Sequence, residues 1–130
     1  MMESLFPILV QAHHWMGWAA LIAGLILGVV ALYAGVVRHR DATPQFRRGV
    51  YAVFGLVLVQ AGLGSLLYVL GGRPLEQVHL IYGIGAVLAL PFFMFVERTA
   101  QKRPAMSSYI WGGFLLAGIA LRAIMTGAAG

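Results

Sequence analysis

The sequence predicts an all-α integral membrane protein, a four-helix bundle formed by one domain over residues 1–130. Two observations predict this class. Hydrophobic residues make up 61% of the chain and charged residues only 10%, whereas soluble domains contain roughly 25% charged residues. The few charges also separate long uncharged runs, and none of these runs alternates apolar and polar residues as the strands of a membrane barrel do. An ordinary soluble domain and a disordered chain are therefore both excluded.

The uncharged runs are each long enough to cross a bilayer as a helix, which takes about 20 apolar residues for a core of about 30 Å. They are 34, 24, 20 and 18 residues long and cover residues 4–37, 49–72, 77–96 and 104–121. Because the first run exceeds one crossing, we expect residues 1–7 to form an interfacial lead-in and Pro7 to stand in the first helical turn. The expected spans are about 7–37, 46–70, 75–96 and 107–126.

The net charge of +5 and the pI near 10.3 would suit a nucleic-acid partner, but such a partner needs a basic face on a soluble domain. Seven of the nine basic residues instead lie in two segments, 38–48 and 98–103, which four spans place on one side. The positive-inside rule predicts that this side is cytoplasmic. We therefore expect no nucleic-acid partner, both termini on the outer side, and a multi-pass protein of a prokaryotic cytoplasmic membrane.

Small residues recur at steps of three and four in the first span, which lets another helix or a flat ligand approach the backbone closely. They share one narrow stripe, formed by Gly17, Ala20, Gly24, Gly28, Ala31 and Gly35. Polar side chains at membrane depth are costly and tend to face the bundle and mark function. The candidates are Gln11, His13, His14, Gln60, His79 and Arg122.

Helical rotation places His13 on the small-residue stripe, one turn before Gly17, whereas His14 points about 100° away. In the third span, Tyr82 and Gly83 follow His79 by three and four residues, so His79 also has a gap one turn deeper. Two inward histidines above glycines suit a flat macrocycle. We therefore expect His13 and His79 to be the two axial ligands of a haem b iron. The chain has no cysteine, which excludes thiolate ligation and covalent haem attachment.

Haem propionates are anions and need cations at the water interface. Arg73 and Arg122 are the basic residues on the side of the histidines, so we expect them to anchor the propionates. Each polar candidate also has a simpler interpretation. Arg122 can extend to the outer surface, Gln60 can bond between helices, Tyr82 can either pack or line a quinone pocket, and His14 can be an interfacial residue or the alternative ligand.

One condition applies to the histidine pair. His13 lies 25 residues before Arg38, whereas His79 lies 18 residues before Glu97, a difference of about 10 Å at helical rise. For the two imidazoles to meet, the first helix must project further into the cytoplasm, or the third must bend, for example at Pro91.

Two stretches carry a resemblance to a known family: Gln-Ala-Gly-Leu-Gly, from Gln60 to Gly64, and Leu-Glu-Gln-Val-His-Leu, from Leu75 to Leu80. Together they resemble the haem A synthase family, in which a Gln-x-x-x-Gly helix leads through a short loop to a His-Leu helix. The resemblance covers about 80 residues, or one half of such a protein up to the third helix. It implies that His79 and an earlier histidine ligate one b-type haem.

In that family the earlier histidine corresponds to His13. The family has an acid where this chain has Val10, and an arginine where this chain has His14. The pair of loop cysteines found in many members, and the second half of those proteins, have no counterpart in this sequence. That acid is implicated in hydroxylating a haem methyl group. The resemblance therefore supports haem binding by this chain more strongly than it supports the enzymatic activity. A related small four-helix b-type cytochrome shares the same bundle and exchanges electrons with quinones.

The leading expectation is single-electron transfer by a bis-histidine haem b in a membrane redox chain. One alternative is a non-catalytic subunit of a larger respiratory or photosynthetic complex, with a chlorophyll-type pigment or no cofactor. The other is a half-size enzyme similar to haem A synthase, so whether the chain is an enzyme stays open. The expected partners are the lipid bilayer, other redox subunits or further copies of the chain, and a quinone.

Overall fold

The computed structural model describes residues 1–99 and 104–127, and within them the chain is helical without strands. The helices follow one another as α1 (Met2–Leu32), continued by a π-helical turn η1 (Tyr33–Val37), then α2 (Pro44–Val69), α3 (Val78–Thr99) and α4 (Ala105–Gly127). All four helices are long and apolar enough to cross a membrane. The predicted all-α four-helix bundle is confirmed, and the chain has the features of a multi-pass membrane protein.

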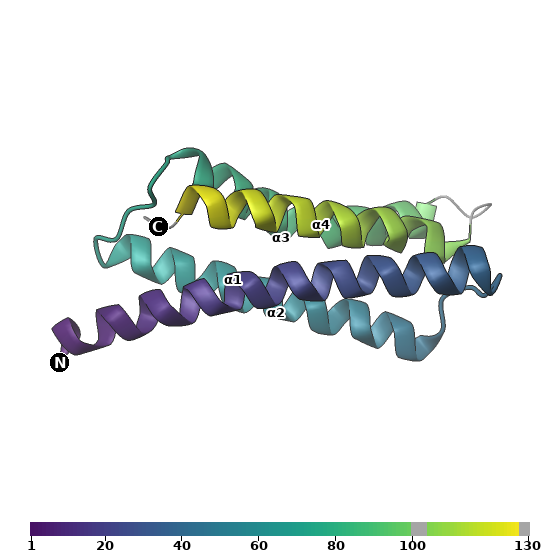
Figure 1. The fold of residues 1–130 in the computed structure, drawn as a ribbon, viewed down its shortest axis with the longest axis horizontal. Coiled ribbons are helices and arrows are strands. Elements are labelled where there is room, and N and C mark those ends of the chain that lie inside the picture. Colours follow the sequence, from purple (N-terminus) through teal and green to yellow (C-terminus); the bar gives the residue numbers. More distant parts are fainter. Residues whose placement is uncertain (100–103, 128–130) are drawn as a thin grey trace.

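The bundle has two distinct ends. The start of α1, the α2–α3 connection and the last turn of α4 lie at one end, and the α1–α2 connection lies at the other (Figure 1). Arg38, Arg40, Arg47 and Arg48 belong to this second end, which we call the arginine-rich end. Arg98, in the last turn of α3, also lies there, whereas Lys102 and Arg103 lie outside the described residues.

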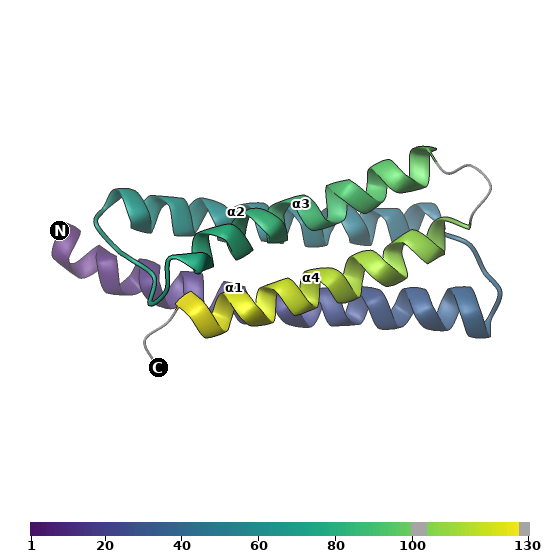
Figure 2. The ribbon, with the colours of Figure 1, turned by 90° about the horizontal axis from the view of Figure 1, so that it is seen from above.

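The helices form a square in which α1 and α3 occupy opposite corners. Helix α1 packs against α2 and α4, and α3 packs against the same two helices. The α1–α4 pair is the most extensive, and α2 packs least against the others. A residue on α1 and a residue on α3 therefore meet only across the middle of the bundle (Figure 2).

The small-residue stripe of α1 forms the α1–α4 contact. Gly17, Ala20, Gly24, Gly28 and Ala31 are all buried. A methyl group on Gly24 would lie 3.1 Å from the backbone nitrogen of Ala117, and one on Gly113 of α4 would overlap the backbone of Gly28. The predicted close approach therefore takes place against α4.

All four helix starts differ from the expectation, and α4 begins at Ala105, two residues before its expected start. Helix α1 begins at Met2, so residues 2–7 are helical and Pro7 lies inside the helix. Proline is tolerated there because it removes a single hydrogen bond, to the carbonyl of Glu3, close to an exposed helix end. Helix α2 begins at Pro44, two residues before the expected start, because the Thr43 side chain accepts a hydrogen bond from the backbone nitrogen of Phe46 and caps the helix.

Helix α3 begins at Val78, three residues after the expected start. The backbone nitrogens of Leu75 and Glu76 donate to the carbonyls of Gly127 and Thr126, at 3.2 and 2.9 Å. The backbone of Leu75 and Glu76 is therefore bound to the last turn of α4, and α3 begins after these residues. His79 consequently lies at the very start of α3, where we had expected it one turn inside.

Polar contacts connect the loops and helices at the arginine-rich end. The Arg47 guanidinium donates to Glu97 of α3 at 2.6 and 3.1 Å, and the Tyr109 hydroxyl of α4 donates to the other oxygen of the same carboxylate. Asp41, in the α1–α2 loop, accepts a hydrogen bond from the backbone nitrogen of Met106 at 3.2 Å. Its carboxylate therefore caps the start of α4.

Candidate functional site

The imidazoles of His13 and His79 meet between the four helices, toward the end of the bundle opposite the arginine-rich end. Their ring centroids are 6.1 Å apart, and the ring planes are 85° to one another. The helix from Met2 to Val37 has 36 residues, and it projects beyond α3 at the arginine-rich end (Figure 2). The histidines were expected to lie at the same height along the bundle either through a longer first helix or through a bend in the third. The structure shows the longer first helix.

His79 is held by a backbone carbonyl of α4. Its Nδ1 lies 2.7 Å from the carbonyl oxygen of Ala123. A carbonyl oxygen only accepts, so Nδ1 carries the proton and Nε2 keeps its lone pair. Histidines that ligate metals commonly use this arrangement, because the outer hydrogen bond fixes the tautomer and the orientation of the ring.

His13 is held by a close helix contact. A methyl group on Gly64 of α2 would lie 2.8 Å from its Cε1, so glycine at this position makes room for the ring. The Nδ1 of His13 and the Oε1 of Gln60 are both buried, and neither has a hydrogen-bond partner among the described residues. Two unpaired polar atoms in an apolar interior are costly, and their presence marks this region as a site.

A small cavity lies beside the two imidazoles and touches all four helices. Its volume is about 60 Å³, and its lining is mostly alanine and glycine. The polar side chains in the lining are those of His13, Gln60 and His79. The remaining lining residues are Ala20, Val57, Ala61, Gly83, Ala86, Leu116, Ala120 and Ala123.

The separation of the two rings matches that of two imidazoles bound to one metal ion. Two metal–nitrogen bonds of about 2 Å, with each ring centre roughly 1 Å further on, place the two centroids about 6 Å apart, close to the 6.1 Å observed. Each ring can rotate about its metal–nitrogen bond, so the angle of 85° is compatible with ligation.

The cavity is smaller than the macrocycle. Small-molecule pockets have volumes of about 300–1,000 Å³, so the 60 Å³ cavity must widen for a porphyrin to enter. Gly83 faces open space, with no atom within 4 Å of where a methyl group would stand.

Three other candidates, on α1, α3 and α4, lie around this pair. Gly17 is buried, and a methyl group there would lie 3.2 Å from the Nε2 of Gln60. Tyr82 is half-buried and lies outside the cavity lining. The guanidinium of Arg122, which is exposed, lies 5.7 Å from the centre of the Tyr82 ring.

Arg73 and His14 lie apart from the cavity. The Arg73 guanidinium stacks on Tyr68 at 3.9 Å and donates to the carbonyls of Tyr68 and Gly72, at the end of α2. The His14 ring contacts Trp15 edge-on, with 5.7 Å between centroids. Arg73 and Arg122 are therefore at the histidine end of the bundle, and neither touches an imidazole.

Three residues hold the histidines through contacts that the sequence did not indicate. Ala123 acts through its carbonyl, which every residue type has, so no side chain could indicate it. Gly64 makes room for His13, and a methyl group on Gly127 would lie 2.5 Å from the Cε1 of His79. The Gln60–Gly64 spacing was recognised as a motif, but its contact with His13 depends on how α1 and α2 pack.

The described residues contain no group of three or more histidine, cysteine or carboxylate side chains that could hold a metal ion. The metal-binding potential found there thus rests on the pair of imidazoles. No protein-family model matches the chain, and comparison with curated proteins and with solved structures found no match.

Proposed function

We propose that the chain binds haem b between His13 and His79 and transfers single electrons within a membrane. The observation that carries this proposal is the pair of imidazoles from opposite helices, 6.1 Å apart. One of them is fixed by a backbone carbonyl so that its Nε2 is free. This is the donor set and spacing that an iron with two axial histidines requires.

Haem suits this site better than a bare metal ion does. Two imidazoles satisfy only two positions of a metal, and transition metals in proteins commonly take four to six ligands. A porphyrin supplies four nitrogens of its own, so two protein ligands complete the set. When bound, haem supplies a one-electron iron couple, and the protein supplies ligands, burial and orientation.

Gln60 has a defined place in the proposed site. Its buried amide lies one turn from Gly64, which contacts the His13 ring, and its Oε1 lacks a partner. We infer that a small movement of α2 on haem binding brings the Gln60 oxygen into hydrogen-bond contact with the His13 Nδ1–H. His13 then gains the outer hydrogen bond that the Ala123 carbonyl gives to His79.

The arginines and Tyr82 belong to the rim of the proposed site. Arg122 and Arg73 are exposed cations at the histidine end, and we assign them the propionates. Tyr82, beneath Arg122, is then placed at the edge where a quinone would exchange electrons. The excess of arginine at the opposite end makes that end cytoplasmic, so the haem lies toward the outer face of a prokaryotic membrane.

Spectroscopy of the purified chain tests the proposal. The wild-type chain, reconstituted with haemin, is expected to show a b-type α-band in the reduced-minus-oxidised spectrum. His13→Ala and His79→Ala should each abolish the bis-histidine spectrum, whereas His14→Ala and His39→Ala, which change histidines away from the cavity, should retain it. A wild-type chain that stays colourless after reconstitution refutes the proposal and favours a non-catalytic subunit.

The resemblance to haem A synthase motivates an enzyme as the second candidate. Such an enzyme converts the haem rather than only holding it, so the haem extracted from cells that express the chain would change in composition. An unchanged haem profile, together with an intact b-type spectrum, leaves electron transfer as the function.

A further inference from the structure

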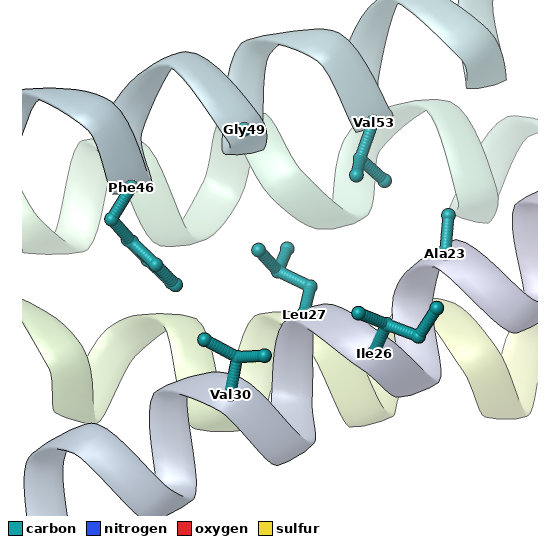
Figure 3. Close-up of a pocket in the computed structure, with 7 residues that line it drawn as sticks. All are labelled: Ala23, Ile26, Leu27, Val30, Phe46, Gly49 and Val53. Carbon is teal, nitrogen blue, oxygen red and sulfur yellow. The ribbon is translucent and has the colours of Figure 1, made fainter.

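A second cavity lies far from the histidines, between α1 and α2. It has a volume of about 300 Å³, and its lining is entirely apolar. Figure 3 shows Phe46, Gly49 and Val53 of α2 facing Leu27 and Val30 of α1 across an open gap. Ala23 and Ile26 complete the lining. We call these seven residues the α1–α2 groove.

The groove is a recess with a closed floor and open edges. Leu27 is 6% exposed and forms the floor, whereas Ile26 and Val30 at the edge are 58% and 45% exposed. No atom lies within 4 Å of where a methyl group on Gly49 would stand. The lining covers residues 23–30 of α1 and 46–53 of α2, which is a length of about 10 Å. A narrow apolar chain fits this shape, because it can lie along the groove and leave the bilayer continuous at its sides.

Toward the arginine-rich end, the groove leads to the segment that joins α1 to α2. The loop that joins α1 to α2 necessarily closes this end of the groove, and it contains Arg38 and Arg40. The backbone nitrogen of Arg40 donates to the carbonyl of Ala34 at 2.8 Å, so the loop folds back over the end of η1. The Asp41 carboxylate, which stands next in the loop, is bound to backbone nitrogens. Among the described residues, neither Arg38 nor Arg40 forms an ion pair.

We propose that the α1–α2 groove binds one anionic glycerophospholipid, with an acyl chain in the groove and the phosphate between Arg38 and Arg40. An apolar recess and an unpaired pair of guanidinium groups at its end match the two parts of such a lipid. A zwitterionic lipid is attracted less strongly by the two arginines, because the cation of its own headgroup offsets the charge of the phosphate. The proposal is independent of the histidine pair and of haem.

Native mass spectrometry of the full chain tests this site. The chain is placed in nanodiscs of equimolar dioleoyl phosphatidylglycerol and dioleoyl phosphatidylcholine, and the lipid that stays bound after release is identified. The wild type should retain phosphatidylglycerol preferentially. Each of Arg38→Gln and Arg40→Gln should lower that preference about 5-fold, as expected for one arginine at an anionic surface. Inorganic phosphate, which lacks acyl chains, should not compete.

Matched variants separate a specific site from general attraction to the basic end. Arg48→Gln and Arg98→Gln remove the same charge at the same end from exposed positions outside the groove and should keep the preference. Gly49→Leu fills the groove and should abolish retention, whereas Gly118→Leu adds the same side chain at an open position on α4 and should not. Circular dichroism checks that each variant is folded.

Three results would overturn the proposal. The first is equal retention of the two lipids by the wild type, and the second is an equal loss in Arg38→Gln and Arg48→Gln. The third is retention that survives Gly49→Leu, or a change from dimer to monomer in that variant with lipid retention unchanged, which would identify the groove as a contact between copies. If Gly49→Leu fails to fold, the comparison of Arg38→Gln with Arg48→Gln still decides.

Discussion

At the scale of single residues, the position of the His13 ring depends on the absence of one methyl group. A Cβ on Gly64 would lie 2.8 Å from the His13 Cε1, which is too close for carbon atoms that are not bonded. Gly64→Ala is therefore expected to turn the imidazole away from His79 while the fold is kept, because only the end of a side chain has to move. Haem retention should weaken about 10–100-fold, the effect of losing the groups that orient a metal ligand.

The control for this prediction lies two residues away on the same helix. Gly62 has no atom within 4 Å of where its Cβ would stand, so Gly62→Ala makes the same chemical change without a collision. Haem titration of both purified variants, followed by absorbance, measures the difference. Equal haem affinity in the two variants would show that the contact between Gly64 and His13 does not orient the ligand.

The pairing of His13 and His79 could be predicted because each imidazole lies on a helix face that its small neighbours identify. Helical rotation alone placed His13 with Gly17 and separated it from His14. The atoms that hold the two rings could not be predicted in this way. A backbone carbonyl such as that of Ala123 has no sequence signal, and the contact of Gly64 with His13 depends on the relative rotation of α1 and α2.

At the scale of helices, the α1–α4 pair depends on backbone contact. A methyl group on Gly113 would overlap the backbone of Gly28, which cannot move aside as a side chain can. Gly113→Ala should therefore force the helices apart and lower the free energy of unfolding by about 1–3 kcal/mol, the usual cost of overpacking. Gly118→Ala, on the same helix but facing open space, should have little effect.

Unfolding of the two variants in mixed micelles by increasing SDS, followed by circular dichroism, measures this difference. Both substitutions raise helix propensity equally, so propensity cancels in the comparison. An equal stability of Gly113→Ala and Gly118→Ala would mean that the close approach of α1 and α4 does not contribute to the stability of the bundle.

The extents of the helices were predicted from charge positions and differ from the structure where polar groups bind elsewhere. Residues 75–77 were expected to belong to the third helix, but the backbone nitrogens of Leu75 and Glu76 bind the end of α4. Glu97 was treated only as a boundary charge, although it binds Arg47 and Tyr109 and thereby connects three helices. Such tertiary contacts join residues that are distant in sequence, so a reading of local pattern cannot find them.

At the scale of the whole molecule, four crossings place the start of α1 and the α1–α2 loop on opposite sides of the membrane. Because the chain has no cysteine, single cysteines can report each side. If the N-terminus is on the outer side, as the arginines predict, Ser4→Cys should react with a membrane-impermeant maleimide added to intact cells. Gln45→Cys, at the exposed start of α2, should react only after the membrane is opened. The reverse pattern would contradict the orientation derived from the arginines.

The fold class could be predicted from composition because a membrane leaves few solutions for a chain of this kind. Backbone groups in lipid must be satisfied within each segment, so long apolar runs become helices. The order of the helices around the square did not follow from this rule. It depends on which small residues face which partner, and the choice of α4 as the main partner of α1 appears only in the folded structure.

The extensive contact between α1 and α4 joins two helices that are far apart along the chain, which has a consequence for the order of assembly. While the chain is being synthesised, the glycine face of α1 has no lasting partner until α4 has entered the membrane. The carbonyl that orients His79 also belongs to α4. A nascent chain that stalls after three helices therefore lacks both its closest helix interface and an oriented pair of imidazoles. The packing of α4 against α1 therefore provides the helix interface and the orientation of His79 in a single step.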